Sequence, residues 1–320
     1  MRAILTTALL LFIGCPITAE SADILRLSGP PIAESLPLLV MSRQARPWTQ
    51  DFEVRFVPWH SPDMLRAMVA GGQVDAAIVT TAAACTLRNR GVNCRVALLH
   101  ESPVWIVSTR PGPDTLESLE GTLLFPFGPG EMPELFYKAA MTGRTGKVET
   151  RHTGGALEAV NLLLAGEGDH AMLSEPTASI ALLRARAMAD KGVPQLVKRV
   201  DMCKAWTRTF PGHSLASSCV AFFGDEADDQ RLLAVFAKAY AGACRWVKEN
   251  PGEALVLAQR RFPALARQIE QSGVDRFAFK ILSGESARVD ARFYLSRIRD
   301  ISPDAIGGDI PGDDFFEVTP

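Results

Sequence analysis

The feature that most constrains the fold is a helix–turn–strand pattern that occurs twice in the chain. Residues 70–81 read Ala-Gly-Gly-Gln-Val-Asp-Ala-Ala-Ile-Val-Thr-Thr. Residues 165–175 read Ala-Gly-Glu-Gly-Asp-His-Ala-Met-Leu-Ser-Glu, the same pattern with one residue deleted. In each copy glycine ends a helix and an apolar strand follows. This pattern predicts two similar halves. The similarity could also arise because both halves use the same common helix–turn–strand unit, so it does not by itself establish a repeat.

Both halves alternate strands with helices. In the first half we expect strands at 24–27, 52–57 and 74–79, with helices at 32–44 and from Ser61–Pro62 to Gly71. In the second half we expect strands at 123–125, 147–151 and 169–173. Alternation of this kind predicts layered α/β lobes with parallel strands. Ligands of open α/β sheets bind outside the carboxyl ends of the strands, so two facing lobes would share one site.

The residues at these strand ends are the candidate ligand-binding residues. They are Ser28, Gly29, Pro30, Trp59, His60, Thr80, Thr81, Phe127, Gly128, His152, Ser174 and Glu175. Backbone amides near Ser28 could face a ligand at a helix start, and the threonine hydroxyls could hydrogen-bond a ligand oxygen. Glu175 could accept hydrogen bonds from a ligand amine.

Each of these residues also has a structural interpretation. Ser28 to Pro30 could be an ordinary turn, Thr80 and Thr81 helix caps, and Glu175 a carboxylate that stabilises a helix start. Trp59, Phe125 and Phe127 could form an aromatic wall or belong to the core. His60 and His152 could bind a metal, but lone histidines at helix starts more often form hydrogen bonds, and we expect no metal.

The N-terminus predicts export. One arginine precedes a mainly apolar run over residues 4–14, which is too short to span a bilayer and has the length of a signal-peptide core. Residues 1–19 would be a signal peptide cleaved after Ala19. Alternatively, residues 12–15 form a lipobox with Cys15 as a lipidated N-terminus, although Phe12 departs from the usual leucine.

An exported compartment permits disulfides. The pairs nearest in sequence are Cys85 with Cys94 and Cys203 with Cys219, while Cys244 lies in a helical run. The alternative is that all five are reduced core residues. No spacing matches a zinc pattern such as C-x-x-C.

The last third of the chain is predicted to be helical. We expect helices at 228–247, 251–261 and 287–299, and a strand at 216–223 that returns the chain to the first lobe. The tail, residues 307–316, is expected to be a loop or a poorly ordered terminus.

Composition and motifs exclude several classes of function. The net charge is −2 and the basic residues are scattered, which is unlike a nucleic-acid-binding protein. No G-x-S-x-G motif or phosphate-binding loop is present, because no Gly-Lys-Ser or Gly-Lys-Thr follows residues 127–130. No catalytic set and no cofactor are expected.

Four patterns in order resemble the periplasmic solute-binding proteins of the nitrate/sulfonate/taurine class, which includes relatives that bind thiamine-pyrimidine precursors. They are the Leu-Pro-Leu at 36–38, the helix and Val-Asp-Ala-Ala of 65–79, the leucines, Ala-Gly and Glu-Pro of 163–176, and the Trp-Val and Asn-Pro of 246–251. The resemblance implies a type II periplasmic-binding-protein fold, two α/β lobes joined by a two-strand hinge. It implies a first lobe of residues 20–105 and 205–320 and a second of residues 106–204.

The expected function is therefore the extracytoplasmic substrate-binding component of an ABC importer. It would be a monomer that captures a small organic solute or anion, either sulfonate-, taurine- or nitrate-like or pyrimidine-like, and docks on a permease and ATPase. An enzyme of thiamine-pyrimidine precursor metabolism and a periplasmic ligand-sensing module are the alternatives.

Overall fold

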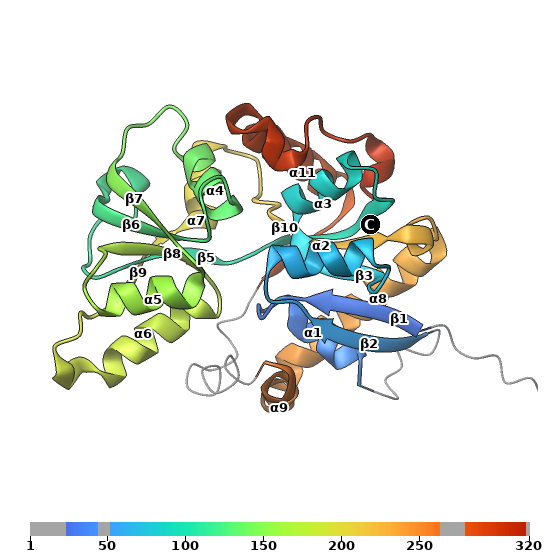
Figure 1. Ribbon diagram of the computed structural model, residues 1–320, viewed down its shortest axis with the longest axis horizontal. Helices are drawn as coiled ribbons and strands as arrows, with labels where there is room; N and C mark the ends of the chain where they lie inside the picture. The colour runs from blue at the N-terminus through green and yellow to red at the C-terminus, as the bar shows by residue number, and fades with distance from the viewer. Residues whose placement is uncertain (1–23, 44–51, 263–278, 318–320) are drawn as a thin grey trace, which may run out of the picture.

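The structure is a computed structural model, and it describes residues 24–43, 52–262 and 279–317. Two lobes lie side by side, each built on its own sheet (Figure 1). The expected signal peptide at 1–19 and the lipobox at Cys15 lie outside the described residues.

The first sheet has six strands in the order β11-β4-β10-β3-β1-β2. Their bounds are β1 Ile24–Gly29, β2 Glu53–Pro58, β3 Ala76–Thr80, β4 Cys94–Glu101, β10 Ser218–Phe223 and β11 Lys280–Leu282. Strands β1, β2 and β3 are parallel, and β10 runs antiparallel between β3 and β4. The expected strands of the first half are confirmed, with ends shifted by one or two residues.

The second sheet has five strands in the order β7-β6-β8-β5-β9. Their bounds are β5 Val104–Ser108, β6 Glu120–Pro126, β7 Lys147–Thr153, β8 His170–Ser174 and β9 Val197–Asp201. Strand β6 is parallel to both β7 and β8, and β5 is antiparallel to β8 and β9. The parallel trio in each lobe confirms the α/β architecture.

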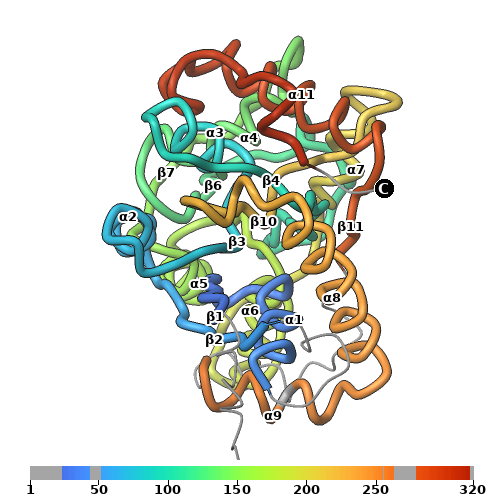
Figure 2. The backbone as a smooth tube through the Cα atoms, turned by 90° about the vertical axis from the view of Figure 1, so that its right-hand side faces the viewer, coloured from blue at the N-terminus to red at the C-terminus, as the bar shows by residue number. Residues whose placement is uncertain are grey.

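Each sheet lies between two layers of helices (Figures 1 and 2). In the first lobe, α2 Pro62–Ala70, α3 Thr81–Asn89 and α11 Gly284–Ile301 cover one face, and α1 Ser35–Met41, α8 Gln230–Glu249 and α9 Pro251–Arg261 cover the other. In the second lobe, α4 Met132–Ala140 and α7 Met202–Thr209 lie opposite α5 Ala156–Leu164 and α6 Thr177–Ala187. Short 3-10 turns occur at 116–118, 189–191, 224–227, 303–306 and 313–315.

The repeated sequence pattern corresponds to a repeated piece of structure. Helix α2 leads into β3 in the first lobe, and α5 leads into β8 in the second. The aspartate that precedes each strand has the same role in both lobes. Asp75 accepts a hydrogen bond from the backbone N–H of Arg26 on β1 at 2.6 Å, and Asp169 accepts one from that of Thr122 on β6 at 2.9 Å. Each aspartate thus ties the end of a helix–turn unit to the middle strand of the parallel trio in its lobe.

The chain crosses between the lobes twice. The first crossing is Ser102–Pro103, between β4 and β5, and the second is residues 210–217, between α7 and β10. Each crossing is hydrogen-bonded to a strand end or helix start of one lobe. Thr81 N–H donates to the carbonyl of Ser217 at 3.0 Å, and Glu175 N–H donates to that of Pro103 at 3.0 Å. The lobes are therefore linked by two short segments rather than by a broad covalent junction.

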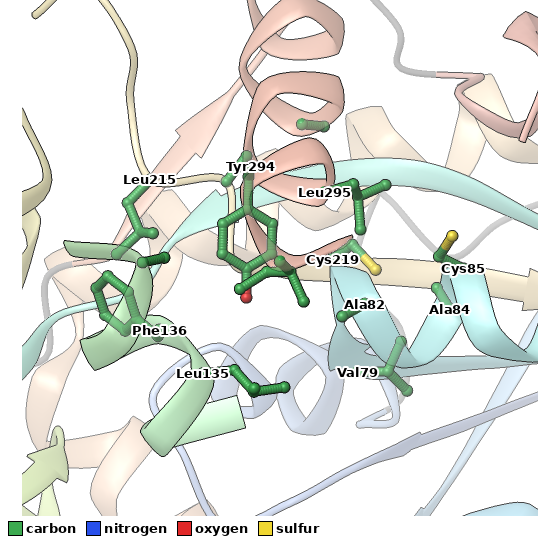
Figure 3. Close-up of a cluster of buried hydrophobic side chains, with 14 of the residues drawn as sticks. Val79, Ala82, Ala84, Cys85, Leu135, Phe136, Leu215, Cys219, Tyr294 and Leu295 are labelled. Carbon is green, nitrogen blue, oxygen red and sulfur yellow. The ribbon is translucent and has the colours of Figure 1, made fainter. Parts of the chain in front are cut away.

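Helix α11 packs against both lobes. Its Tyr294 is 1% exposed and lies between Leu135 and Phe136 of α4 and the β3–α3 segment of the first lobe (Figure 3). The Tyr294 ring centroid is 5.7 Å from that of Trp206 on α7. Since α4 and α7 belong to the second lobe, α11 joins the hydrophobic cores of the two lobes.

The expectation of a loose tail is wrong. Phe315 and Phe316 are fully buried, and Phe316 forms an isolated β-bridge with Val96 of β4. Burial of two phenylalanines stabilises this position by about 1.5–3 kcal/mol for each side chain. Within the described residues, no helix has the length and apolar character that crossing a membrane requires.

Candidate functional site

The carboxyl ends of the parallel strands of the two lobes are turned toward each other. Strands β1 and β2 point from the outer edge of the first lobe toward the second, and α4, which follows β6, lies on the side of its lobe nearest the first (Figure 1). We call the six segments that follow these strand ends the facing turns. They are residues 30–34, 59–61, 81–83, 127–131, 154–155 and 175–177.

Three of the predicted binding residues are buried, and their side chains form hydrogen bonds or ion pairs within the protein. Ser28 is fully buried and its hydroxyl donates to the carbonyl of Val57 at 2.6 Å. Thr81 is fully buried and its hydroxyl donates to the carbonyl of Ala216, on the second crossing, at 2.7 Å. This corrects the expectation that these hydroxyls lie free to face a ligand. The reason is that a buried hydroxyl needs a hydrogen-bond partner, and the nearest acceptor is a backbone carbonyl of the neighbouring strand or crossing.

Glu175 is the third of these, and it is 2% exposed. Its carboxylate pairs with the ammonium group of Lys198 on β9 and accepts hydrogen bonds from the N–H and hydroxyl of Ser179 at 3.2 Å. Glu175 therefore has the contacts expected of a carboxylate at a helix start, and its contact with a solute stays a prediction. Both Thr81 and Glu175 are buried.

Except for Gly29, the remaining predicted residues keep part of their surface accessible. Trp59 is half-buried and its indole N–H donates to the carbonyl of Ile78 at 3.2 Å, while His60 is exposed. Thr80 is half-buried and caps α3 by accepting from Ala83 N–H at 3.1 Å. Pro30 and Ser174 are half-buried at the ends of β1 and β8. Gly29 is enclosed, because a Cβ there would lie 2.3 Å from the hydroxyl oxygen of Ser35.

Phe127 and Gly128 are both exposed, in the facing turn that follows β6. Phe127 is 38% exposed and has a φ of 73°, the left-handed region that side chains other than glycine rarely adopt. It bridges Thr153 at the end of β7. Phe125, two residues earlier, is fully buried and belongs to the core, so the expected aromatic wall loses one of its three members.

His152 lies beside Phe125, with ring centroids 5.9 Å apart, and its Nε2 is 3.4 Å from Glu134 Oε2 without hydrogen-bond geometry. His60 is on the other lobe. Across the described parts of the chain, no group of three or more histidine, cysteine, aspartate or glutamate side chains is placed to hold a metal ion.

Sequence reasoning missed a buried polar pair next to the first crossing. Glu34, at the start of α1, is 1% exposed and accepts a hydrogen bond from the hydroxyl of Ser102. Burial raises the pKa of the Glu34 carboxyl, and the bond from Ser102 offsets only part of that rise. A glutamate before a helix gives no sequence signal of burial, so this residue could be found only in three dimensions.

A shallow polar hollow of about 450 Å³ opens next to the crossings, not between the facing turns. It is lined by Glu101, Asp201, Cys203, Lys204, Thr207 and Arg208. Asp201 caps α7 there by accepting from Cys203 N–H at 3.0 Å. Its side chains are already paired with each other or with the backbone, so we assign it no ligand.

The five cysteines among the described residues are free thiols, so both expected disulfides are absent. The Cys203 thiol is directed to the carbonyl of Ser102 at 3.2 Å and that of Cys94 to the carbonyl of Ala84 at 3.7 Å. Burial raises the pKa of Cys85 and Cys203 to about 12. The alternative of reduced core cysteines is therefore the correct one for this structure.

No family model matches the chain, and no curated protein matches it in sequence. Solved structures do match in fold. An ABC transporter protein from Parabacteroides distasonis is 18% identical with a TM-score of 0.70, covering 92% of this chain and 98% of that one. The periplasmic aliphatic sulphonate-binding protein SsuA of Escherichia coli is 14% identical with a TM-score of 0.65, covering 89% and 95%.

The periplasmic nitrate-binding protein NrtA of Synechocystis is 13% identical with a TM-score of 0.60, covering 89% of this chain and 84% of that one. These matches extend over 89–92% of this chain. The chain has the two-lobed fold of the periplasmic binding proteins.

Proposed function

We propose that this chain is the extracytoplasmic substrate-binding component of an ABC importer. The observation that carries the proposal is the geometry of the strand ends. Two parallel strand trios, one in each lobe, direct their carboxyl ends at each other, and only two short crossings join the lobes. A solute held between the facing turns would contact both lobes at once, so binding and closure would be coupled.

The proposed lobes are residues 20–105 with 205–320, and 106–204. Bending would concentrate at Ser102–Pro103 and at residues 210–217, where the chain passes between the sheets. The accessible strand-end residues, Pro30, Trp59, His60, Phe127, Gly128, His152 and Ser174, are the proposed contacts for the solute. The closed form would dock on a permease whose transport is driven by an ATPase.

We propose further that the protein is exported and acts outside the cytoplasm as a monomer, either soluble after cleavage behind Ala19 or anchored through Cys15. The short apolar run at residues 4–14 supports export. Intact-mass measurement of protein taken from cells distinguishes the two mature forms from an uncleaved chain.

The test of the receptor role combines native mass spectrometry with small-angle X-ray scattering. Protein isolated from its own cells should carry one small molecule, and its radius of gyration should increase when that molecule is dialysed away. Turnover of the molecule by the protein would favour the enzyme alternative. An unchanged radius would contradict the clamp.

A further inference from the structure

The facing turns contain no lysine and no arginine. They read Pro-Pro-Ile-Ala-Glu at 30–34, Trp-His-Ser at 59–61, Thr-Ala-Ala at 81–83, Phe-Gly-Pro-Gly-Glu at 127–131, Gly-Gly at 154–155 and Glu-Pro-Thr at 175–177. A carboxylate, sulfonate or phosphate is held most strongly by a guanidinium or ammonium group. The turns proposed to hold the solute offer none.

Free backbone amides at helix starts could replace a cation, but at or beside each of these helix starts the chain already bonds at least one amide to an acceptor of its own. Ser61 accepts from Met64 N–H at 3.2 Å at the start of α2, and Thr80 accepts from Ala83 N–H at 3.1 Å at the start of α3. Two glutamates reach back into the turns, where Glu134 accepts from Gly130 N–H and Glu158 from Gly154 N–H, both at 2.7 Å.

At the other two helix starts, backbone amides are also hydrogen-bonded to acceptors within the chain. Glu175 accepts from Ser179 N–H at the start of α6. At the start of α1, Ser35 N–H and Leu36 N–H donate to the carbonyls of Ile32 and Ala33, both at 3.1 Å. At least one amide at or beside each of the six helix starts is therefore already bonded within the chain.

The carboxylates of this region differ in whether their charge is already neutralised. Glu175 is paired with Lys198, and Glu134 with Lys138 at 2.7 Å. Burial alone would raise the pKa of Glu134, but the bond from Gly130 and the Lys138 ammonium outweigh it and hold that pKa below its usual range. Glu34 is buried, with a raised pKa.

Glu131 is the exception. It is exposed at the start of α4, and its carboxylate makes no hydrogen bond or ion pair with any residue that the structure describes. Phe127, exposed and held in a left-handed conformation, lies in the same five-residue turn. An exposed aromatic ring and a free carboxylate within one turn suit a positively charged nitrogen group, which the ring quadrupole and the carboxylate both attract.

We propose that the solute is a small organic cation, with a protonated or quaternary nitrogen and no negative charge, whose nitrogen is held by Glu131 and Phe127. This assignment rests on the proposed receptor function and narrows it. It separates this chain from the sulphonate- and nitrate-binding proteins that share its fold.

The test uses two probes that share a ring and differ in charge. Benzyltrimethylammonium and benzenesulfonate are titrated separately into the full chain, with intrinsic tryptophan fluorescence and thermal unfolding as readouts. The cation should bind saturably and raise the melting temperature, and the anion should not. Glu131→Gln and Phe127→Ala should each weaken binding of the cation roughly tenfold or more. Glu149→Gln, which removes an exposed carboxylate on β7 away from the turns, should leave binding unchanged.

Saturable binding of benzenesulfonate that Phe127→Ala abolishes would overturn the assignment, as would failure of the cation to bind. An affinity for the cation that Glu131→Gln leaves unchanged would also overturn it. Scattering on the same samples separates this inference from the receptor role. If the anion closes the lobes, the receptor role stands and the charge assignment fails. If the cation binds without closure, the charge assignment stands and the clamp fails.

Discussion

At the scale of single residues, His100 is the least satisfied polar side chain of the first lobe. It lies on β4, fully buried, and neither ring nitrogen has a hydrogen-bond partner among the residues that the structure describes. Its ring stacks on Tyr240 with centroids 5.5 Å apart and meets the edge of Phe279 at 5.2 Å. Burial lowers the pKa of His100 to about 3. The contacts of this ring are those of an aromatic hydrophobic residue.

We expect His100 to make the protein acid-sensitive. The ordinary histidine pKa of about 6.5 applies to the unfolded chain, which therefore binds the extra proton first as the pH falls. The free energy of unfolding should decline from about pH 6.5 toward 3, by roughly 5 kcal/mol at the lower end. His100→Phe should keep the ring contacts, remove this decline and be at least as stable at pH 7.

Urea unfolding of both proteins at pH 7, 5.5 and 4 measures this difference. Glu34, whose pKa is raised, acts in the opposite direction, because its contribution to stability is lost as the pH rises above about 4.5. It is present in both proteins and cancels in the comparison. Equal pH dependence in the two proteins would contradict the role given to His100.

Lys198 is the residue that allows Glu175 to be buried. Its side chain is 21% exposed, while that of Glu175 is only 1% exposed. Lys198→Met should leave an uncompensated buried charge and lower the free energy of unfolding by about 3–5 kcal/mol. The double variant with Glu175→Gln should recover part of that loss, and chemical denaturation measures both. A single variant as stable as the parent would show that the ion pair is dispensable.

At the scale of elements, α11 is the helix on which the contact between the lobes depends. Its Phe293 and Tyr294 meet an aromatic cluster formed by Phe136 on α4 and by Trp206 and Phe210 at α7. The neighbouring ring centroids of this cluster lie between 4.7 and 6.2 Å apart. The helix therefore packs against the second lobe although its own sheet neighbours are in the first.

We expect Tyr294→Ala to cost about 3–5 kcal/mol of unfolding free energy, because it opens a cavity where the two cores meet. Tyr294→Phe keeps the ring and loses only a weak contact from the hydroxyl to the sulfur of Met132, so its cost should stay below about 1.5 kcal/mol. Val289→Ala, on the exposed side of the same helix, is the control and should change little. Denaturant unfolding followed by fluorescence gives all three values.

At the scale of the whole molecule, the two crossings determine how the lobes can move. Ser102 is bonded to both lobes, since its hydroxyl donates to Glu34 and its carbonyl accepts from the thiol of Cys203. Thr81 fastens the second crossing through Ala216 and Ser217. Rotation of one lobe on the other must change the geometry at these four contacts, so they are the expected hinge points.

Closure can be measured by energy transfer between dyes on the two lobes. Val57 and Leu157 are exposed, each two residues from a facing turn, and can be replaced by cysteine. The native thiols of the described residues are poorly reactive, because burial raises the pKa of Cys85, Cys203 and Cys244 to about 12. Transfer efficiency should rise with the copurified solute at the same dissociation constant as thermal stabilisation. Stabilisation by about 2.7 kcal/mol at 100 times that constant, without a change in transfer, would contradict a closing clamp.

Several features follow from the sequence alone. Alternating strands and helices, glycines at helix ends and the Ser61–Pro62 start of α2 depend on interactions within a few residues, and all were correctly predicted. The paired helix–turn–strand units belong to this group, because the same local pattern folds in the same way in both lobes. Two lobes of parallel strands could therefore be predicted before any coordinates were known.

Which strand-end side chains remain free was decided only by the tertiary structure. Thr80 and Thr81 are adjacent and chemically identical, yet one caps a helix and the other binds a crossing 135 residues away. Glu175 is neutralised by Lys198, from another strand, whereas Glu131 has no such partner among the described residues. The burial of the last phenylalanines likewise depends on β4, far along the chain. Local sequence determines the elements, but the partner of a polar or aromatic side chain is set by whichever distant segment the fold brings next to it.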